Sequence, residues 1–340
     1  MAELRWNPLL KDWTMVAANR QNRPDMPKDF CPFCPEFGRV PNYDVYKYDN
    51  DFPVLSQEPP KPDDVGSEFY KVKRAYGKCE VILYSPDHNA SLCELNVDHI
   101  KKLVDLWTDR FIELSKDEKI KYVYIFENRG KEVGVTMPHP HGQIYGYSFM
   151  PVKIRTELES SKEYYEENDQ CLFCEMNEEE ISFQKRVITE NDDFIAYLPF
   201  FTDYPYGVFI LSKRHISNLA EFTDDEKYNF AKILKDVTGT FDTLFNKRFP
   251  YMMAIHQSPV NSPEYENHDE YYHFHVEFYP PLRGENSIKY NASSETGAWA
   301  YANPRSIEET SIELRDAYKR FKESISNKGG GYIGLSRIKI

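Results

Sequence analysis

The stretch MPHPHGQIYGY at residues 137–147 has a counterpart in EYYHFHVEFY at residues 270–279. In an extended strand, alternate side chains point to the same side, so His139, His141 and Gln143 line one surface. Gly142 removes a side chain at a point where a ligand could approach the main chain. Two solvent-facing or hydrogen-bonded histidines would explain either stretch by itself, so the rest of the chain has to decide.

A second pattern repeats together with these histidine runs. A Cys-x-x-Cys pair, a β-rich run ending in a histidine, a helical pattern, a further strand and a His-x-His run follow one another twice along the chain. One such pair could arise by chance, but two copies with matching histidines indicate an internal duplication. The first copy contains Cys31, Cys34, His88 and His139, and the second contains Cys171, Cys174, His215 and His273.

Each copy also predicts one amphipathic helix after its strand histidine. Asn96 and Thr223 are expected to cap these helices, and TDDE at 223–226 has the spacing of a capping box. The apolar positions recur with helical spacing. They are Ile100, Leu103, Val104, Trp107, Phe111 and Leu114 in the first copy, and Tyr228, Ala231, Leu234, Val237, Phe241 and Leu244 in the second.

The predicted fold class is therefore α+β, built from two related units. Residues 1–155 form the first unit and residues 156–340 the second, each with an antiparallel sheet and helices packed on it. The charged stretch at 156–170 is expected to bridge them as a polar helix. SQEPPKPDD at 56–64 is typical of a surface loop.

Two thiolates and two imidazoles form a tetrahedral zinc site, so the sequence predicts two zinc ions per chain. Four protein ligands leave no open position for a catalytic water, which makes both ions structural. A redox role for the Cys-x-x-Cys pairs is the alternative, but it leaves the paired histidines of each copy unexplained.

The two histidines of HPHGQ then have different roles. His139 is a zinc ligand, whereas His141 is not needed for the zinc set and is held next to a fixed ligand. Imidazole is a competent nucleophile near neutral pH. Gln143 can donate a hydrogen bond but cannot give up a proton, so it favours transfer of a bound group over hydrolysis.

At this point the chain resembles the galactose-1-phosphate uridylyltransferase family, a branch of the histidine-triad superfamily. The resemblance extends from about residue 6 to about residue 318 and is most specific in FENRGKEVGVTMPHPHGQIYGYSFMP at 126–151. It implies that His141 attacks the α-phosphorus of UDP-glucose, releases glucose 1-phosphate and passes UMP to galactose 1-phosphate. It also implies that Gln143 stabilises the transition state.

The same resemblance implies a set of substrate-binding residues. Arginine suits this role because its planar fork pairs with phosphate oxygens. Thr136 stands where the family usually has serine. The implied residues are Arg20, Arg23, Asn50, Asp51, Asn128, Gly134, Thr136, Lys289 and Glu295.

Two departures from the family pattern bear on the metal and on the sugar. Better-known members hold iron in the second half through a glutamate and histidines. The corresponding positions here are Glu157, His256, His275 and Glu277. The intact Cys171 and Cys174 favour zinc. The run NASS at 291–294 replaces a Val-Gly-Tyr-type run before Glu295, so the identity of the sugar is less well determined than the chemistry.

Two rival functions remain open from the sequence. A related enzyme, an ADP-sugar phosphorylase, would use the same zinc sites and histidine but would bind adenine and use phosphate as the acceptor. A non-catalytic, zinc-stabilised nucleotide-binding module is the alternative from a different class. Asn50, Asp51 and the arginine pair favour uridine.

Composition and charge exclude other classes. The chain of 340 residues has a net charge of -13, which disfavours a nucleic acid partner. No apolar run approaches the ~18 residues that a membrane span requires. Six cysteines with no export signal indicate metal binding in a reducing cytoplasm. The resemblance further implies a homodimer whose active sites are completed across the interface.

Overall fold

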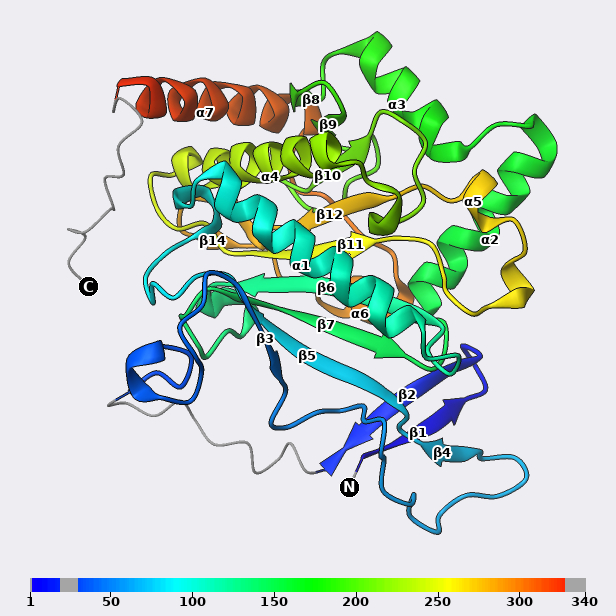
Figure 1. The fold of residues 1–340 in the computed structure, drawn as a ribbon. Coiled ribbons are helices and arrows are strands. Elements are labelled where there is room, and N and C mark those ends of the chain that lie inside the picture. Colours follow the sequence, from blue (N-terminus) through cyan, green and yellow to red (C-terminus); the bar gives the residue numbers. More distant parts are fainter. Residues whose placement is uncertain (1, 19–29, 328–340) are drawn as a thin grey trace.

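The computed structural model describes residues 2–18 and 30–327, and its centre is one antiparallel sheet that runs through both halves of the chain (Figure 1). The strand order is β3-β5-β7-β6-β11-β12-β10-β9-β8. These strands are β3 (Tyr46–Asp49), β5 (Gly77–Leu83), β6 (Tyr122–Arg129), β7 (His141–Tyr147), β8 (Val187–Glu190), β9 (Phe194–Tyr197), β10 (Val208–Ser212), β11 (Tyr251–His256) and β12 (His275–Tyr279).

The order is a mirror image about the junction of β6 and β11. The first half contributes β3-β5-β7-β6 and the second contributes β11-β12-β10-β9, with β8 added at the edge. The α+β class and the duplication are thus confirmed. The sequence did not reveal that the two sheets join edge to edge, because a strand's pattern identifies its buried face but not its neighbour.

Helices α1 (Val97–Ser115) and α4 (Asp224–Leu244) cover one face of this sheet. They rest on an apolar row formed by paired positions Ile144, Ile125, Ile255 and Val276 of four adjacent strands. Asn96 caps α1 and Thr223 caps α4 with a capping box, as expected.

One residue of the predicted α4 face was assigned to the wrong side. Tyr228 is 42% exposed, whereas Phe230 is fully buried against the sheet. The helix α7 (Ile307–Asn327) packs on α4, and the ring of Phe321 occupies the space next to Gly239. The buried face of α4 is therefore broader than a single stripe, and its first buried aromatic residue lies two positions after the one that the periodic pattern predicted.

The opposite face is covered differently in the two halves. In the second half, α2 (Val152–Asn168), α3 (Leu172–Phe183) and α5 (His268–Tyr271) pack against β9 and β10. In the first half, the small sheet β1 (Ala2–Asn7), β2 (Asp12–Ala17) and β4 (Val72–Arg74) packs there, and the loop with Cys31 and Cys34 packs on Val81 and Leu83 of β5. The predicted polar helix at 156–170 corresponds to α2.

The remaining elements are short. They are the 3₁₀ turns η2 (Pro35–Phe37), η3 (Leu92–Glu94), η4 (Lys131–Val133), η5 (Leu219–Glu221) and η6 (Pro263–Tyr265), the hairpin β13 (Leu282–Gly284) and β14 (Ser287–Ile288), and the helix α6 (Ser293–Ala298). Within residues 2–18 and 30–327, no helix combines the length and the apolar character that crossing a membrane demands.

Candidate active site and metal centres

The first Cys/His group comes together at the start of β7. The Sγ atoms of Cys31 and Cys34 each lie 3.6 Å from His139 Nδ1, and Cys34 Sγ lies 3.5 Å from His88 Nδ1. A tetrahedral zinc with Zn–S near 2.3 Å and Zn–N near 2.0–2.1 Å places sulfur and nitrogen about 3.6 Å apart. The donor atoms and their spacing therefore fit a zinc ion.

The orientation of His139 is fixed from behind. Its Nε2–H donates to the carbonyl of Ser85 at 2.9 Å, and the hydroxyl of Tyr43 lies 2.9 Å from the same nitrogen. Burial lowers the pKa of His139 to about 4, so the ring is neutral. Nδ1 then carries the lone pair that a metal requires, directed at the two sulfurs.

The second Cys/His group repeats this arrangement. Cys174 Sγ lies 3.4 Å from His215 Nδ1 and 3.5 Å from His273 Nδ1, and Cys171 Sγ lies 4.0 Å from His273 Nδ1. His273 Nε2–H donates to the carbonyl of Ser212 at 2.9 Å, as His139 does to Ser85. The structure thus assembles all eight predicted ligands into two groups suited to a metal.

His141 is the first residue of β7, and its ring is oriented by the main chain. Its Nδ1–H donates to the carbonyl of His139 at 2.7 Å. A carbonyl can only accept, so the hydrogen sits on Nδ1 and Nε2 carries the lone pair. The Phe33 ring, between the two cysteines, lies 5.9 Å from the His141 ring. Two parts of the first Cys/His group therefore support the His141 ring, the carbonyl of His139 and the ring of Phe33.

Gln143 lies two residues along β7 on the same face as His141. Its Oε1 accepts from the Tyr145 hydroxyl at 3.3 Å, which directs the amide NH₂ away from that oxygen. In the sheet it pairs with Val81 of β5 and Phe126 of β6. The first half thus presents a nucleophilic nitrogen and an amide donor on a half-buried face.

His275 is the counterpart of His141 in the second half. Its Nδ1–H donates to the carbonyl of His273 at 2.9 Å, and the ring of Phe173 stacks on it at 4.5 Å. Phe33 and Phe173 were not predicted as supporting residues. The sequence signal was the Phe that directly precedes the second cysteine of both pairs.

A third group surrounds His275 and lies under α2. Glu157 Oε2 is 2.9 Å from His256 Nδ1, and His275 Nε2 is 3.6 Å from Glu277 Oε1 and 3.9 Å from Glu157 Oε2. Lys153 pairs with both carboxylates. This group shares no ligand with the Cys171 group, so the two sets are not alternatives for one ion.

Burial and charge act in opposite directions at Glu277. Burial by itself would raise the pKa of Glu277, but the charges of His256 and Lys153 outweigh it and hold the pKa below the ordinary value. The carboxylate is therefore ionised and closed off by its neighbours. His275 Nε2 is buried, and its nearest charged neighbours are the carboxylates of Glu277 and Glu157.

The expectation for Gly142 was wrong. A Cβ built on Gly142 would lie 2.2 Å from the hydroxyl of Tyr84 and 3.0 Å from the carbonyl of Phe126. The glycine is required because Tyr84 fills that space from the α1 side, not because a ligand approaches there. The sequence pattern identified a close approach but could not identify which group approaches.

Several residues implied by the family resemblance lie in or next to the strands of the first half and the loop before β7. Asn50 and Asp51 directly follow β3, at the edge of the first half. Asn128 is in β6, the strand next to β7. Gly134, in a left-handed conformation with a φ of 80°, and Thr136 lie exposed in the loop that leads from β6 to His139. Arg20 and Arg23 fall outside the described residues.

Lys289 and Glu295 make their contacts with residues of the second half. Lys289 Nζ donates to Asn291 Oδ1 at 3.0 Å and lies 4.9 Å from the centre of the Tyr204 ring. The carboxylate of Glu295 accepts from the backbone N–H of Ala292 at 3.1 Å and closes the first turn of α6. Both follow β12, which is three strands from β7 in the sheet.

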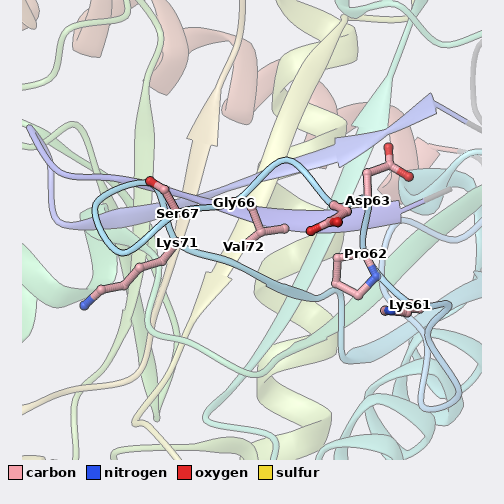
Figure 2. Close-up of a pocket in the computed structure, with 8 residues that line it drawn as sticks. Lys61, Pro62, Asp63, Gly66, Ser67, Lys71 and Val72 are labelled. Carbon is pink, nitrogen blue, oxygen red and sulfur yellow. The ribbon is translucent and has the colours of Figure 1, made fainter.

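A cavity of about 480 Å³ lies elsewhere, in the loop before β4 (Figure 2). Its lining includes Lys61, Asp63, Ser67 and Lys71, and Figure 2 shows these side chains spread along one loop. None of the predicted site residues lines it. Its residues are near in sequence and exposed, so it reflects the shape of that loop.

The family model for the N-terminal domain of galactose-1-phosphate uridyl transferase matches residues 1–151, and the model for the C-terminal domain matches residues 157–291. The Thermotoga maritima galactose-1-phosphate uridylyltransferase is 43% identical over 318 residues, covering 93% of this chain and 98% of that protein.

The chain belongs to the galactose-1-phosphate uridylyltransferase family. It is therefore a nucleotidyltransferase of galactose metabolism that transfers UMP. The Saccharomyces cerevisiae uridylyltransferase is 32% identical over 318 residues, covering 84% of this chain and 86% of that protein.

Solved structures agree with this assignment. A uridylyltransferase structure has a TM-score of 0.85 at 31% identity and covers 94% of this chain and 99% of that one. An ADP-glucose phosphorylase from Arabidopsis thaliana with bound ADP-glucose has a TM-score of 0.70 at 26% identity and covers 93% and 99%. The uridylyltransferase fold thus superposes more closely on this chain than that phosphorylase does.

Proposed function

We propose that the chain transfers UMP from UDP-glucose to galactose 1-phosphate through a covalent uridylyl group on His141. The observation that carries this proposal is the hydrogen bond from His141 Nδ1–H to the His139 carbonyl. It keeps the lone pair on Nε2 and turns that nitrogen toward the face that Gln143 shares. A nucleophile oriented by a neighbouring acceptor is the arrangement that covalent catalysis requires.

In the first step, His141 Nε2 forms a bond to the α-phosphorus and the bond from that phosphorus to the glucose 1-phosphate oxygen breaks. The electron pair leaves with glucose 1-phosphate, whose phosphate oxygen carries the charge. The imidazole keeps its Nδ1–H, and the His139 carbonyl stabilises the positive charge of the substituted ring. In the second step, an oxygen of galactose 1-phosphate attacks the phosphorus and His141 is released.

Gln143 would donate its amide N–H to a phosphoryl oxygen as negative charge builds there. The Tyr145 hydroxyl on Gln143 Oε1 keeps the amide from rotating. A glutamine has no proton to lose, so it does not activate water. The intermediate is then preserved until the second sugar phosphate arrives.

The remaining substrate contacts are part of the same proposal. The uridine and ribose would contact the edge strand and the β6–β7 loop, and the phosphates would contact the arginines and Lys289. The residues assigned to these contacts are Arg20, Arg23, Asn50, Asp51, Asn128, Gly134, Thr136, Lys289 and Glu295.

A homodimer is proposed for the hexose site. Lys289 and Glu295 follow β12, and β12 is three strands, or roughly 14 Å at about 4.8 Å per strand, from β7, which begins with His141. A second copy could bring the same segment to the His141 face of its partner. We further propose that the protein works in the cytoplasm, where thiolate ligands stay reduced.

Zinc is proposed for both Cys₂His₂ groups, as a structural ion that holds the loop with Phe33 against His141 and the start of α3 with Phe173 against His275. The set of Glu157, His256, His275 and Glu277 is a further place where a metal could bind. Its oxygen and nitrogen donors suit iron or zinc equally, so metal analysis has to decide.

Isotope exchange between UDP-glucose and labelled glucose 1-phosphate, without galactose 1-phosphate, tests the mechanism. Only an enzyme with a uridylyl intermediate catalyses this exchange without the second sugar. A phosphorylase would instead release a nucleoside diphosphate when inorganic phosphate is supplied, and a binding module would do neither. Absence of exchange in the metal-loaded protein would refute the covalent intermediate.

A further inference from the structure

Two buried polar side chains lie behind the strand that carries His141, on the side of α1. Tyr84 directly follows β5 and is 1% exposed, and Glu127 is in β6 and is 6% exposed. Neither belongs to the metal groups, and neither faces the side of the sheet on which His141 and Gln143 lie. The proposed chemistry leaves both without a role.

Tyr84 holds the histidine run by its main chain and by its side chain. Its N–H donates to the carbonyl of Pro140 at 3.0 Å. Its hydroxyl fills the space next to Gly142, where a Cβ would come within 2.2 Å of it. Its own carbonyl lies 2.7 Å from His99 Nε2 of α1, which secures it to the helix layer. The peptide groups on both sides of His141 therefore rest on Tyr84.

Glu127 is an unfavourable residue for its position. One carboxyl oxygen accepts from the Tyr251 hydroxyl at 3.1 Å, but the other is buried without a hydrogen-bond partner within the described residues. The hydroxyl of Tyr84 and Nε1 of Trp107 meet no hydrogen-bond acceptor of good geometry within the described residues, although the Tyr84 hydroxyl is close enough to Glu127 to lower the pKa of that carboxyl. Burial raises the pKa of Glu127 to about 7. Buried polar atoms of this kind are usually satisfied by ordered internal water.

The second half has neither a buried carboxylate nor a glycine at the positions that match Glu127 and Gly142. Phe126 pairs with Gln143 as Ala254 pairs with Glu277, so Ile255 occupies the position that corresponds to Glu127. Val276 stands where the first half has Gly142. Apolar side chains at these two positions are therefore compatible with this fold. Of the two halves, the one with the buried carboxylate is the one with the proposed nucleophile.

A difference of one residue separates the two halves at Tyr84 itself. Leu83 pairs with His141 as Leu211 pairs with His275. From these leucines to the metal-binding histidines there are five positions in the first half, to His88, and four in the second, to His215. The first half thus has one extra residue at this point, where Tyr84 enters the core.

We propose that Tyr84 and Glu127 are positioning residues for uridylyl transfer, which fix the His141–Gln143 backbone from behind. This inference rests on His141 being the nucleophile. The ring of Tyr84 limits how far the Gly142 peptide can move toward α1. Glu127 holds β6, the strand next to β7, through its hydrogen bond with the Tyr251 hydroxyl. A displacement of about 1 Å in a catalytic group can reduce the rate on the order of 10²-fold.

The test compares disruptive and conservative variants at both positions. Tyr84→Leu and Glu127→Leu should each lower kcat for UMP transfer on the order of tenfold or more, with KM for both substrates within about threefold. Tyr84→Phe keeps the ring behind Gly142 and Glu127→Gln keeps a polar group of the same size. In both conservative variants, kcat should stay within about threefold of that of the unmodified enzyme.

Ile255→Ala serves as the matched control. It truncates a fully buried side chain at the corresponding position of the second half, and it should lower Tm without changing kcat by more than about twofold. Metal content and Tm are measured for every variant. A loss of kcat in Tyr84→Leu with both metals retained therefore reports positioning and not general destabilisation.

Three results would overturn the inference. They are a kcat within twofold in both leucine variants, a rise in KM with kcat preserved, and an equal loss of kcat in Ile255→Ala. The proposed function is judged by a different variant, because exchange that survives in His141→Asn would refute it. The two failures are thus distinguishable.

Discussion

The two halves of this molecule have the same strand and histidine arrangement, but the second histidine of each His-x-His run lies in different surroundings. His141 and His275 each follow a metal-ligand histidine by two residues, and each donates its Nδ1–H to that residue's carbonyl. His141 lies half-buried on a face with Gln143, whereas His275 is fully buried between Glu157 and Glu277. The same backbone geometry therefore holds the proposed nucleophile in one half and a closed ionic group in the other.

The element that makes the difference is α2. This helix places Lys153 and Glu157 over β11 and β12, where their charges close the second site. Among the described residues, the first half has no such helix on that face, which is covered there by the small β1-β2-β4 sheet and by the loop with Cys31 and Cys34. Access to one histidine and its absence at the other thus follow from what packs on the sheet, since the strands themselves are alike.

The largest expected effect separates the two histidines. His141→Asn should abolish exchange between UDP-glucose and glucose 1-phosphate with metal content unchanged, because only the nucleophile is lost. His275→Asn should leave exchange measurable while lowering the free energy of unfolding, because it disrupts a buried ionic group. Exchange that disappears in His275→Asn but persists in His141→Asn would reverse the assignment of the two halves.

A smaller effect is expected two residues along each strand. Gln143→Ala removes a donor to the phosphoryl oxygens and should lower kcat by about 10²–10³-fold. Glu277→Gln removes a charge that Lys153 and His256 balance, so it should lower stability and leave kcat within about threefold. Steady-state kinetics and thermal unfolding of both variants check this, and activity within twofold in Gln143→Ala would make Gln143 a packing residue.

Metal content tests whether the Cys/His groups are equivalent. The purified protein should contain about two zinc ions in these groups, and Cys31→Ser and Cys171→Ser should each lose one. We expect Cys31→Ser to lower both Tm and kcat, because the loop with Phe33 supports His141, and Cys171→Ser to lower mainly Tm. Iron in the purified protein, lost on mutation of Glu157, would identify the third group as a metal site.

The smallest effect concerns the interior behind the strands. Native Glu127 has a pKa of about 7 against an ordinary value of 4.5, so the native state binds an extra proton between these values. The resulting stability is fully present below pH 4.5 and is lost as pH rises through 7. In Glu127→Gln, the decline in the free energy of unfolding from pH 5 to pH 8 should shrink by on the order of 2–3 kcal/mol.

Denaturant unfolding at the two pH values measures this difference. The neighbouring charges of Arg129 and Asp242 remain in both proteins and form their own ion pair at 2.7 Å, so they largely cancel in the comparison. Ile255 occupies the corresponding position in the second half and does not titrate. An unchanged pH dependence in Glu127→Gln would mean that the carboxyl is not protonated in the native state.

The sequence by itself determined the duplication, the two Cys/His groups that could hold a metal, and the helix caps at Asn96 and Thr223. These are local or periodic features: residue type, spacing and alternation fix them before any long-range contact forms. The family resemblance added the chemistry, because the HPHGQ segment is specific enough to be recognised without a fold.

Only the tertiary structure decided how the halves meet and which histidine is accessible. The pairing of β6 with β11 joins positions more than 100 residues apart, and strand patterns do not specify such partners. The position of α2 over His275 and of Tyr84 behind Gly142 depends in the same way on packing between distant segments. A sequence lists the groups that can react, but burial and neighbouring charge determine which of them will, and both arise only when the chain is folded.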